Sequence, residues 1–305
     1  TMWHRNDVVI RSLNETRVHY LIPELKFPKI VNFTNNISSA IRSATVIVLA
    51  IPSQSIRKLL TDNKSDFNQD QLIVNVSKGI EVDTLMTVSE VINDVLGTTY
   101  NKAVTLSGPS HAEEVVQKHP TTLVAASSNL EAAQKIQDLF ASDMLRTYRN
   151  KDIKGVELGG SMKNVIAIAA GICDGIGYGD NSKAALITRG MAEITRLGKK
   201  MGGKRETFRG LSGFGDLIVT CLSKHSRNRQ IGQAIGEGRS LKEIISEMSM
   251  VAEGIDTAKS VHQLRLKHNV EMPIHEAIYQ VLFDNKDPKS SVVELMNRRL
   301  SEENN

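Results

Sequence analysis

The sequence has few cysteines, no long apolar run and only a small excess of positive charge. Its 305 residues include only Cys173 and Cys221, without a metal-ligand spacing, so neither a disulfide framework nor a zinc site is expected. No apolar run reaches about 18 residues, so we expect neither secretion nor membrane insertion, and cytoplasm is the default. A net charge of +4 is too small and evenly spread to indicate nucleic-acid binding, but a local basic pocket for an anionic substrate is compatible with it.

Glycine is absent from the first part of the chain, where Gly79 is the first to occur. A dinucleotide-binding domain normally opens with a strand, a glycine-rich turn and a helix N-terminus that receives the pyrophosphate. A Rossmann-type sheet in this chain would therefore lack its first strand and phosphate loop. Gly175, Gly177 and Gly179 resemble that turn superficially, but no strand is expected before them, and we predict an interhelical turn there.

The composition is that of an ordinary globular protein, with 40% hydrophobic and 24% charged residues, and the length suits two domains. Predicted strands alternate with helices up to about residue 150, which indicates an α/β fold with a mainly parallel sheet. Only helices are predicted after residue 151. The expected fold is an N-terminally incomplete Rossmann-type parallel sheet over 1–150, followed by an all-α domain over 151–305.

The predicted elements follow from hydrophobic periodicity and turn residues. Strands are expected at 45–52, 72–76 and 103–106, and less clearly at 122–126 and 145–148. The run 45–52 is continuous and β-branched, so it should be covered on both faces. A loop is expected at 20–28. Helices are predicted at 8–13, 37–42, 54–60, 83–96, 111–118, 130–140, 156–172, 182–201, after 228, and at 241–247, 257–267 and 274–284.

Three polar segments, 52–54, 77–79 and 107–110, each follow a predicted strand. Ligands in open parallel sheets collect at the carboxyl ends of the strands, so the three together favour a ligand crevice. Each segment taken alone is explained equally well as a simple turn.

Lys163 lies within an apolar segment with helical spacing, after Gly159 and Gly160, which allow close approach of other backbone. Burial disfavours the ammonium form and lowers a lysine pKa, which makes Lys163 a candidate acid or base. The alternative is a lysine that extends to solvent from the edge of its helix.

A second polar cluster occupies 210–232. Gly213 and Gly215 should form a tight turn that presents Asp216, with Thr220 one helical turn further on. Ser226 is a predicted helix N-cap, which places Arg227 and Asn228 in the first turn. Free N–H groups and a guanidinium there would suit a phosphate. The alternative, a solvated basic turn, fits Arg229 and Lys224 best.

Several segments together resemble the bacterial NAD(P)-dependent glycerol-3-phosphate dehydrogenases. They include VELGGSMKNVIAIAAGI, GDNSKAALITRGMAEITRLG, GLSGFGDLIVTC, SRNRQIG, NVSKGIE, LSGPSHAEEV and VAEGI. The resemblance implies a dinucleotide-binding domain at 1–150 and an all-helical substrate domain at 151–305, in a cytoplasmic and usually dimeric enzyme. Such an enzyme interconverts dihydroxyacetone phosphate and sn-glycerol 3-phosphate, a precursor for phospholipid synthesis.

The resemblance also assigns roles to individual residues. Lys163 matches the proton donor and acceptor, and Lys78 matches the lysine that contacts both substrate and nicotinamide. Asp216, Thr220 and Asn164 match other active-site positions. Substrate contacts are expected from Gly108, Ser110, Ser226, Arg227 and Asn228, and further cofactor contacts from His4, Arg5, Tyr20, Ala112, Arg227, Val251 and Glu253.

Ketone reduction explains these residue types. Hydride delivery leaves negative charge on the carbonyl oxygen, which a cationic Lys163 can stabilise and then protonate. The charge of Lys78 should lower the pKa of Lys163, and Asp216 should oppose that effect. His4 and Arg5 stand where an acidic residue would select NAD, so NADPH is the preferred coenzyme, with NADH as the alternative.

Two other functions are compatible with the sequence. One is reduction of a different small hydroxy acid, which the phosphate-type cluster disfavours. The other is a truncated, non-catalytic chain that folds and dimerises but binds cofactor poorly.

Overall fold

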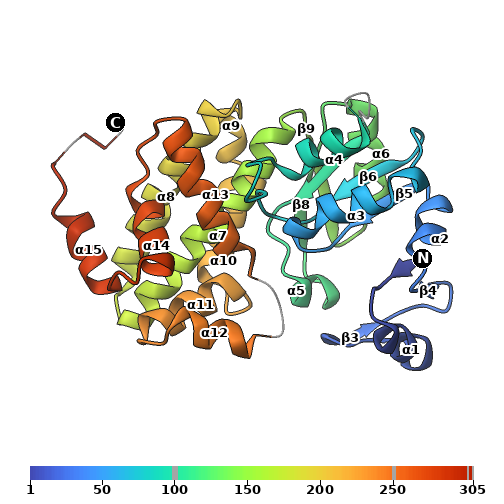
Figure 1. Ribbon diagram of the computed structural model, residues 1–305, viewed down its shortest axis with the longest axis horizontal. Coiled ribbons are helices and arrows are strands. Elements are labelled where there is room, and N and C mark those ends of the chain that lie inside the picture. The colour runs from blue at the N-terminus through green and yellow to red at the C-terminus, as the bar shows by residue number, and fades with distance from the viewer. Residues whose placement is uncertain (98–101, 249–251, 301, 304–305) are drawn as a thin grey trace. The chain divides into compact units, whose positions relative to one another are not determined.

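The computed structural model describes residues 1–97, 102–248, 252–300 and 302–303 (Figure 1). The chain forms two compact units. The first comprises Thr1–Ile51, Ser55–Ser77 and Val88–Ile153, and the second comprises Pro52–Gln54, Lys78–Thr87 and Lys154–Asn305. The segments Pro52–Gln54 and Lys78–Thr87, each of which follows a strand in the chain, are therefore part of the second unit.

The first unit contains a five-stranded sheet with the order β5-β6-β7-β8-β9. Its strands are β5 (Val46–Leu49), β6 (Leu72–Asn75), β7 (Ala103–Ser107), β8 (Thr121–Ala126) and β9 (Leu145–Asn150). All neighbours pair in parallel except β7 and β8, which are antiparallel. The predicted mainly parallel sheet is confirmed, including β8 and β9, for which the sequence pattern was less clear.

Short helices connect these strands, with a core of aliphatic side chains that includes Val74, Val104 and Ile136. The helices of this part are α2 (Ile37–Arg42), α3 (Ile56–Asp62), α4 (Val88–Leu96), α5 (Ala112–Val116) and α6 (Leu130–Phe140), with 3-10 turns at Ser53–Ser55 and Lys64–Asp66. The side chain of Asn129 caps α6 by accepting hydrogen bonds from two backbone N–H groups.

The N-terminal part differs from the sequence prediction. Besides α1 (Asp7–Thr16) it contains β1 (Met2–Trp3), which pairs in parallel with β4 (Phe33–Thr34), and an antiparallel pair, β2 (Val18–His19) with β3 (Ile22–Lys26). The loop predicted at 20–28 is thus wrong over most of its length. Strands of two residues show no periodicity, and the proline in β3 argues against a strand except at an edge.

Two other expectations are wrong in detail. Strand β5 forms as predicted but is not covered on both faces, since Val48 is 45% exposed. The helix predicted at 83–96 begins only at Val88, since Ile80 and Thr87 form an isolated β-bridge and Leu85 has a φ of 61°. Antiparallel pairing within this loop replaces the first turns of the predicted helix.

The second unit is helical in the part of the chain that follows residue 153. Its helices are α7 (Ile153–Ile176), α8 (Asp180–Lys200), α9 (Arg205–Phe208), α10 (Asp216–Leu222), α11 (Arg227–Gly236), α12 (Leu241–Glu247), α13 (Glu253–Lys267), α14 (Pro273–Phe283) and α15 (Pro288–Met296). A π-helical segment, Leu211–Gly215, precedes α10. The predicted interhelical turn after Gly175 is confirmed, and Gly177 there has a φ of 91°.

Helix α7 is the core helix of this unit, and every residue from Gly155 to Cys173 is buried. By length and composition alone it could cross a membrane, contrary to our expectation that no such run occurs. The apolar window is entirely buried inside the protein, as in the core helix of a globular domain.

Helices α7 and α11 approach each other backbone to backbone through four glycines. A Cβ atom on Gly171 would lie 1.9 Å from the carbonyl oxygen of Arg229, and one on Gly232 would lie 1.9 Å from that of Ile168. Gly175 and Gly236, one turn further along each helix, are equally restricted. Only glycine allows this separation, so these positions fix α11 against the helix that carries Lys163.

Candidate active site

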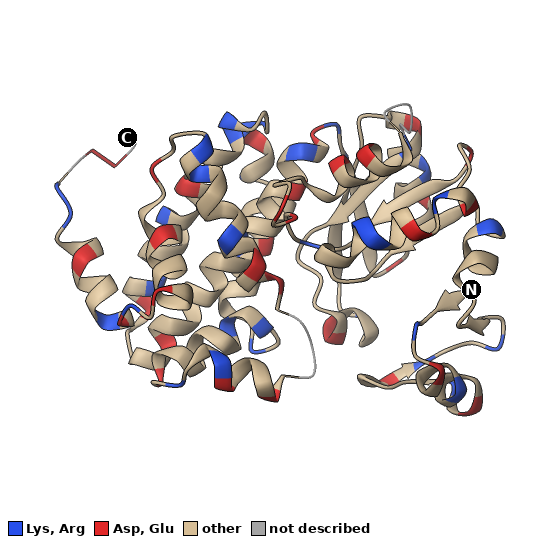
Figure 2. Cartoon of the chain, viewed as in Figure 1, with Lys and Arg blue, Asp and Glu red and all other residues tan. Residues whose placement is uncertain are grey.

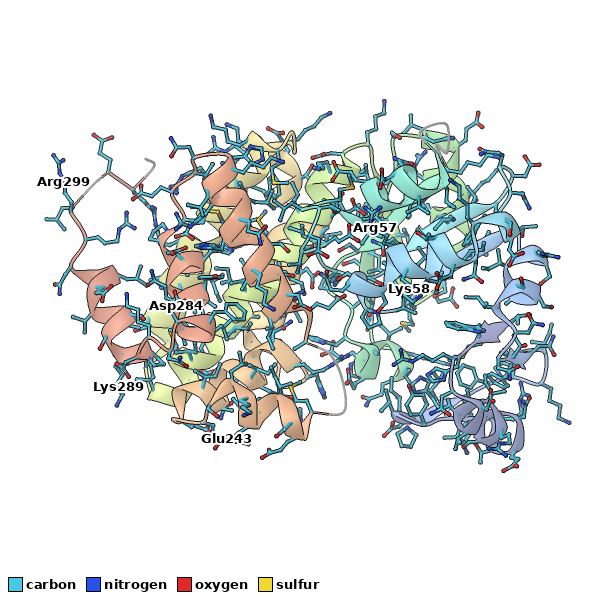
Figure 3. All side chains as sticks on the ribbon, in the orientation of Figure 1. Arg57, Lys58, Glu243, Asp284, Lys289 and Arg299 are labelled. Atoms are coloured by element: carbon cyan, nitrogen blue, oxygen red, sulfur yellow. The ribbon has the colours of Figure 1, made fainter. Side chains whose placement is uncertain are left out.

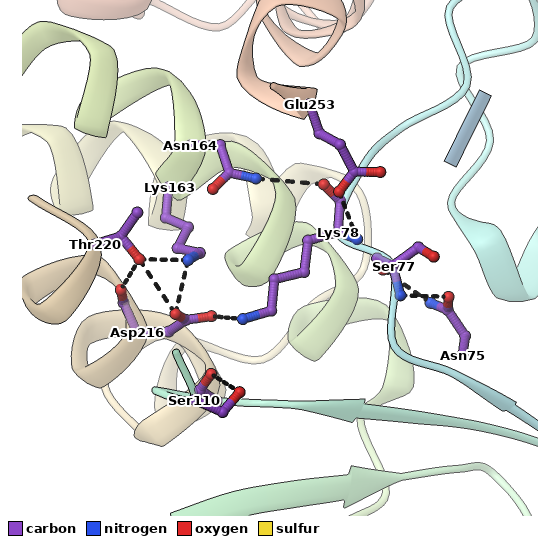
Figure 4. Close-up of polar contacts among 10 residues, drawn as sticks. Asn75, Ser77, Lys78, Ser110, Lys163, Asn164, Asp216, Thr220 and Glu253 are labelled. Carbon is purple, nitrogen blue, oxygen red and sulfur yellow. Dashed lines mark hydrogen bonds and ion pairs between the residues drawn. The ribbon is translucent and has the colours of Figure 1, made fainter. Parts of the chain in front are cut away.

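The side chain of Lys163 is buried in the second unit, with only 4% of the residue exposed. Its Nζ donates a hydrogen bond to Asp216 Oδ1 at 2.7 Å and another to Thr220 Oγ1 (Figure 4). Asp216 and Thr220 are buried as well. The alternative of a lysine that extends to solvent is therefore wrong.

A second lysine binds the same carboxylate. Lys78 Nζ donates to Asp216 Oδ2 at 2.6 Å, so each oxygen of Asp216 faces a different ammonium group (Figure 4). The two lysines thus share one negative charge. This arrangement places two proton donors on either side of one buried carboxylate.

Burial is the main cause that lowers the pKa of Lys163, from 10.5 to about 8. The Asp216 carboxylate opposes this shift and the charge of Lys78 adds to it, as the sequence predicted. Burial alone would raise the pKa of Asp216, but the charges and hydrogen bonds of Lys163 and Lys78 hold it below its usual value. Asp216 therefore stays ionised while Lys163 titrates close to neutral pH.

The position of Asp216 depends on the π-helical segment before it, not on the predicted tight turn. A Cβ atom on Gly213 would lie 2.2 Å from the carbonyl oxygen of Phe208, and one on Gly159 of α7 would lie 3.3 Å from the Cα of Gly213. Thr220 also donates to the carbonyl oxygen of Asp216 at 2.6 Å. These close contacts hold Asp216 against the helix that carries Lys163.

The loop that carries Lys78 is held by side chains of α7 and α13. The backbone N–H of Lys78 donates to Glu253 at 3.0 Å, and its carbonyl oxygen accepts from Asn164 at 3.3 Å (Figure 4). Burial raises the pKa of Glu253, against the opposing effect of the hydrogen bonds that it accepts.

The N-terminus of α11 agrees with the sequence prediction. Ser226 is the N-cap, buried, and its hydroxyl accepts a hydrogen bond from the backbone N–H of Arg229. Arg227 is exposed in the first turn, and Asn228 Oδ1 accepts from the N–H of Gly254 at 3.1 Å. The expectation of a solvated Arg229 is wrong, because its guanidinium binds Asp174 at 2.6 Å.

The remaining predicted residues lie in the first unit. Gly108 has a φ of 150°, and a Cβ atom there would lie 2.9 Å from the carbonyl oxygen of Thr122, so this position requires glycine. Ser110 Oγ donates to the carbonyl oxygen of Gly108 at 3.2 Å, and Ala112 begins α5.

The structure also brings together two of the residues predicted near the adenosine end of a cofactor. The rings of His4 and Tyr20 lie 5.9 Å apart, and Arg5 is exposed beside them in the chain. Val251, which was also predicted to contact the cofactor, lies outside the described residues. In the described ranges, no group of three or more histidine, cysteine or acidic side chains could hold a metal ion.

Charged side chains of both signs alternate over both units (Figure 2). Many form exposed pairs such as Lys58 with Asp62 at 2.7 Å on α3 (Figure 3), which contribute little to stability. The pairs of Asp216 with Lys163 and Lys78 differ because the carboxylate is almost completely buried.

The sequence indicated the segment 52–54 but not what it does. Gln54 Nε2 donates to the carbonyl oxygen of Ile80, and Gln54 Oε1 accepts from the N–H of Val82. The sequence also gave no indication that Asp174 binds both Arg229 and Lys183. Contacts of this kind join segments far apart in the chain, and no local pattern encodes them.

Two family models match the chain. The model described as the NAD-dependent glycerol-3-phosphate dehydrogenase N-terminus matches residues 1–133, and the one described as the C-terminus of the same enzyme matches residues 152–293.

Curated relatives agree with these models. The glycerol-3-phosphate dehydrogenase [NAD(P)+] of Chlorobium phaeobacteroides is 50% identical, and the match covers 99% of this chain and 91% of the relative. The enzyme of the same name from Clostridium perfringens is 51% identical, with 98% and 90% covered. The crystal structure of glycerol-3-phosphate dehydrogenase from Coxiella burnetii superposes with a TM-score of 0.92 at 34% identity, covering 97% of this chain and 90% of that one.

Proposed function

The chain belongs to the NAD-dependent glycerol-3-phosphate dehydrogenase family, and from this premise we propose that it interconverts dihydroxyacetone phosphate and sn-glycerol 3-phosphate with NAD(P)H. The observation that carries this function is the buried group of Lys163, Asp216 and Lys78. The names of the curated relatives favour the enzyme over the non-catalytic alternative and over reduction of a non-phosphorylated oxo acid to its hydroxy acid.

In the proposed mechanism Lys163 is the acid for ketone reduction. The reduced coenzyme, when bound, supplies the hydride. Negative charge then develops on the carbonyl oxygen, where the Lys163 ammonium stabilises it and donates a proton. In the reverse direction the neutral amine accepts that proton. Asp216 and Thr220 orient the Lys163 side chain, while Lys78 provides a second positive charge beside the reacting oxygen.

The phosphate group of the substrate is assigned to the start of α11. Ser226 caps the helix, so the first turn presents backbone N–H groups and the positive end of the helix dipole. Arg227 adds a guanidinium, and Asn228 supports the turn through its bond to Gly254. Gly108 and Ser110 are proposed as further substrate contacts. Binding energy from the remote phosphate can orient the carbonyl group for hydride transfer.

Residues 1–150 are proposed as the coenzyme domain, and residues 151–305 as the substrate domain. His4 and Tyr20 fit an adenine ring because their aromatic side chains lie together, and the exposed guanidinium of Arg5 fits a 2′-phosphate. Ala112, Val251 and Glu253 are proposed as further coenzyme contacts. We also propose a cytoplasmic homodimer.

The function is tested by the oxidation of NADPH on addition of dihydroxyacetone phosphate to the purified chain. A product identified as sn-glycerol 3-phosphate supports the proposal. Turnover of non-phosphorylated 2-oxo acids without turnover of dihydroxyacetone phosphate would contradict it.

The preference for NADPH depends on Arg5. We expect Arg5→Ala to raise KM for NADPH about tenfold, because one charge-assisted hydrogen bond to the 2′-phosphate is lost, while KM for NADH stays nearly constant. Steady-state kinetics with each coenzyme measure this. An equal increase in both KM values would contradict the assignment.

The pH dependence of turnover should follow the ionisation of Lys163. Its pKa of about 8 keeps the ammonium form dominant below that pH, so kcat/KM for reduction should be constant at lower pH and fall about tenfold per pH unit above it. Oxidation requires the neutral amine, so its kcat/KM should rise with pH and level off above the same value. Both profiles are measured with the wild-type chain.

Asp216→Asn provides the control for this assignment. The Asp216 carboxylate raises the pKa of Lys163, so its removal should move the break in both profiles to lower pH. A break that stays in place in this variant would mean that another group titrates.

A further inference from the structure

Glu253, the first residue of α13, binds two loops at once. Its Oε1 accepts a hydrogen bond from the backbone N–H of Ser53 at 2.8 Å. Its Oε2 accepts one from the backbone N–H of Lys78 at 3.0 Å (Figure 4). Ser53 and Lys78 belong to the two short segments that follow β5 and β6 in the chain. One carboxylate therefore joins both segments to the start of α13.

Other side chains hold the same loop at residues 80 and 82. Gln54 binds Ile80 and Val82 through its amide group, and the hydroxyl of Ser260 donates to the carbonyl oxygen of Ile80 at 3.0 Å. The loops also touch directly, since a Cβ atom on Gly79 would lie 2.0 Å from the hydroxyl of Ser53. The loop is thus tightly packed after residue 78. At residue 78 itself Glu253 binds the backbone N–H, and Asn164 binds the carbonyl oxygen with a longer bond of 3.3 Å.

We propose that Glu253 is a positioning residue for Lys78, which fixes the backbone from which the Lys78 ammonium reaches Asp216. This inference rests on the function proposed above. The Lys78 ammonium pairs with the buried Asp216 carboxylate at 2.6 Å, and a shift of the Lys78 backbone would move the start of that side chain. Small displacements of a positioned group can lower the rate strongly, so the place where this backbone is held matters for catalysis. Glu253 would therefore act on catalysis through Lys78, in addition to any contact with the coenzyme.

A displacement of Lys78 should also change the pKa of Lys163, because the two ammonium groups repel each other. Among the described residues, the groups that face Lys163 are the Asp216 carboxylate, the Lys78 ammonium, the Thr220 hydroxyl and the Cys221 thiol. Burial raises the pKa of Cys221 to about 12, so that thiol is uncharged near neutral pH. The charge of Lys78 lowers the pKa of Lys163, so a displaced Lys78 should let that pKa rise.

The first test is Glu253→Gln, which keeps the size of the side chain. Glutamine offers one acceptor oxygen and places an NH2 group against a backbone N–H, so one of the two hydrogen bonds is lost. We expect kcat for reduction to fall about tenfold and the break in its pH profile to move to higher pH. A change in KM for NADPH alone would report only the proposed coenzyme contact of Glu253. A higher KM for NADPH with unchanged kcat and pH profile would overturn the proposal.

A double-mutant cycle separates the two possible routes of action. If Glu253 acts through Lys78, then Glu253→Gln should lower kcat less than about twofold in a chain that already carries Lys78→Ala. The full effect of the substitution in that background would overturn the proposal. Glu247→Gln is the matched control, because its carboxylate pairs at the surface with Arg239, and it should retain wild-type kinetics.

A measurement without turnover distinguishes this proposal from the proposed function. The Cε chemical shift of Lys163, followed through pH by NMR and assigned with Lys163→Arg, reports its pKa directly. That pKa should be higher in Glu253→Gln than in the wild-type chain, and unchanged in Glu247→Gln. An unchanged pKa of Lys163 in Glu253→Gln would overturn the positioning role. If that pKa is raised in Glu253→Gln but the wild-type chain does not reduce dihydroxyacetone phosphate, only the proposed reaction is refuted.

Discussion

Replacing Lys163 with alanine is expected to lower kcat/KM for the reduction of dihydroxyacetone phosphate by about 10³-fold. The substitution removes the group that donates a proton to the carbonyl oxygen, and general acid catalysis contributes on the order of 10²–10⁴-fold. Asp216 keeps its ion pair with Lys78 in this variant, so the carboxylate is not left uncompensated. Steady-state kinetics measure the effect, and the melting temperature shows whether the variant folds.

Lys163→Arg separates proton transfer from simple charge stabilisation. Arginine keeps the positive charge but cannot be deprotonated in a protein, so it should be about as inactive as alanine if proton transfer is required. Lys135→Ala on α6 is the control, because this lysine is exposed and lies in the other unit, and its activity should stay within about twofold. A Lys163→Ala variant that keeps more than about a tenth of the wild-type rate would contradict the assigned role.

Gly232→Ala is expected to lower the free energy of unfolding by about 3 kcal/mol. Its Cβ atom would lie 1.9 Å from the carbonyl oxygen of Ile168, which is backbone of α7 and has no flexible end that can move aside. The two helices must separate, and overpacking of this kind costs about 1–3 kcal/mol or more. Denaturant unfolding monitored by circular dichroism gives the free energy of unfolding.

Gly179→Ala is the matched control. Gly179 has a φ of −85°, and nothing lies within 4 Å of the position that a Cβ atom would take. As the N-cap of α8 it should lose no more than about 1 kcal/mol. Equal stability of the two variants would show that α7 and α11 do not require backbone contact.

The sequence predicted the main parallel sheet because buried parallel strands are continuous apolar runs, as at Leu72–Asn75. It also predicted the N-cap at Ser226 and the turn at Gly177, since capping and positive φ values depend on a few neighbouring residues. It did not predict β1 and β4, which are too short to show periodicity.

By itself the sequence determined that Lys163 stands on a mostly apolar helix and that Ser226 caps a helix whose first turn carries Arg227 and Asn228. Both features depend on neighbouring residues in the chain. Only the tertiary structure decided that Asp216 binds both Lys163 and Lys78, which lie 53 and 138 residues away in the chain. The positions of these three side chains in space depend on glycine contacts between helices and on loops that Glu253 and Gln54 hold. Packing of this kind is non-local, so it arises only when the chain has folded.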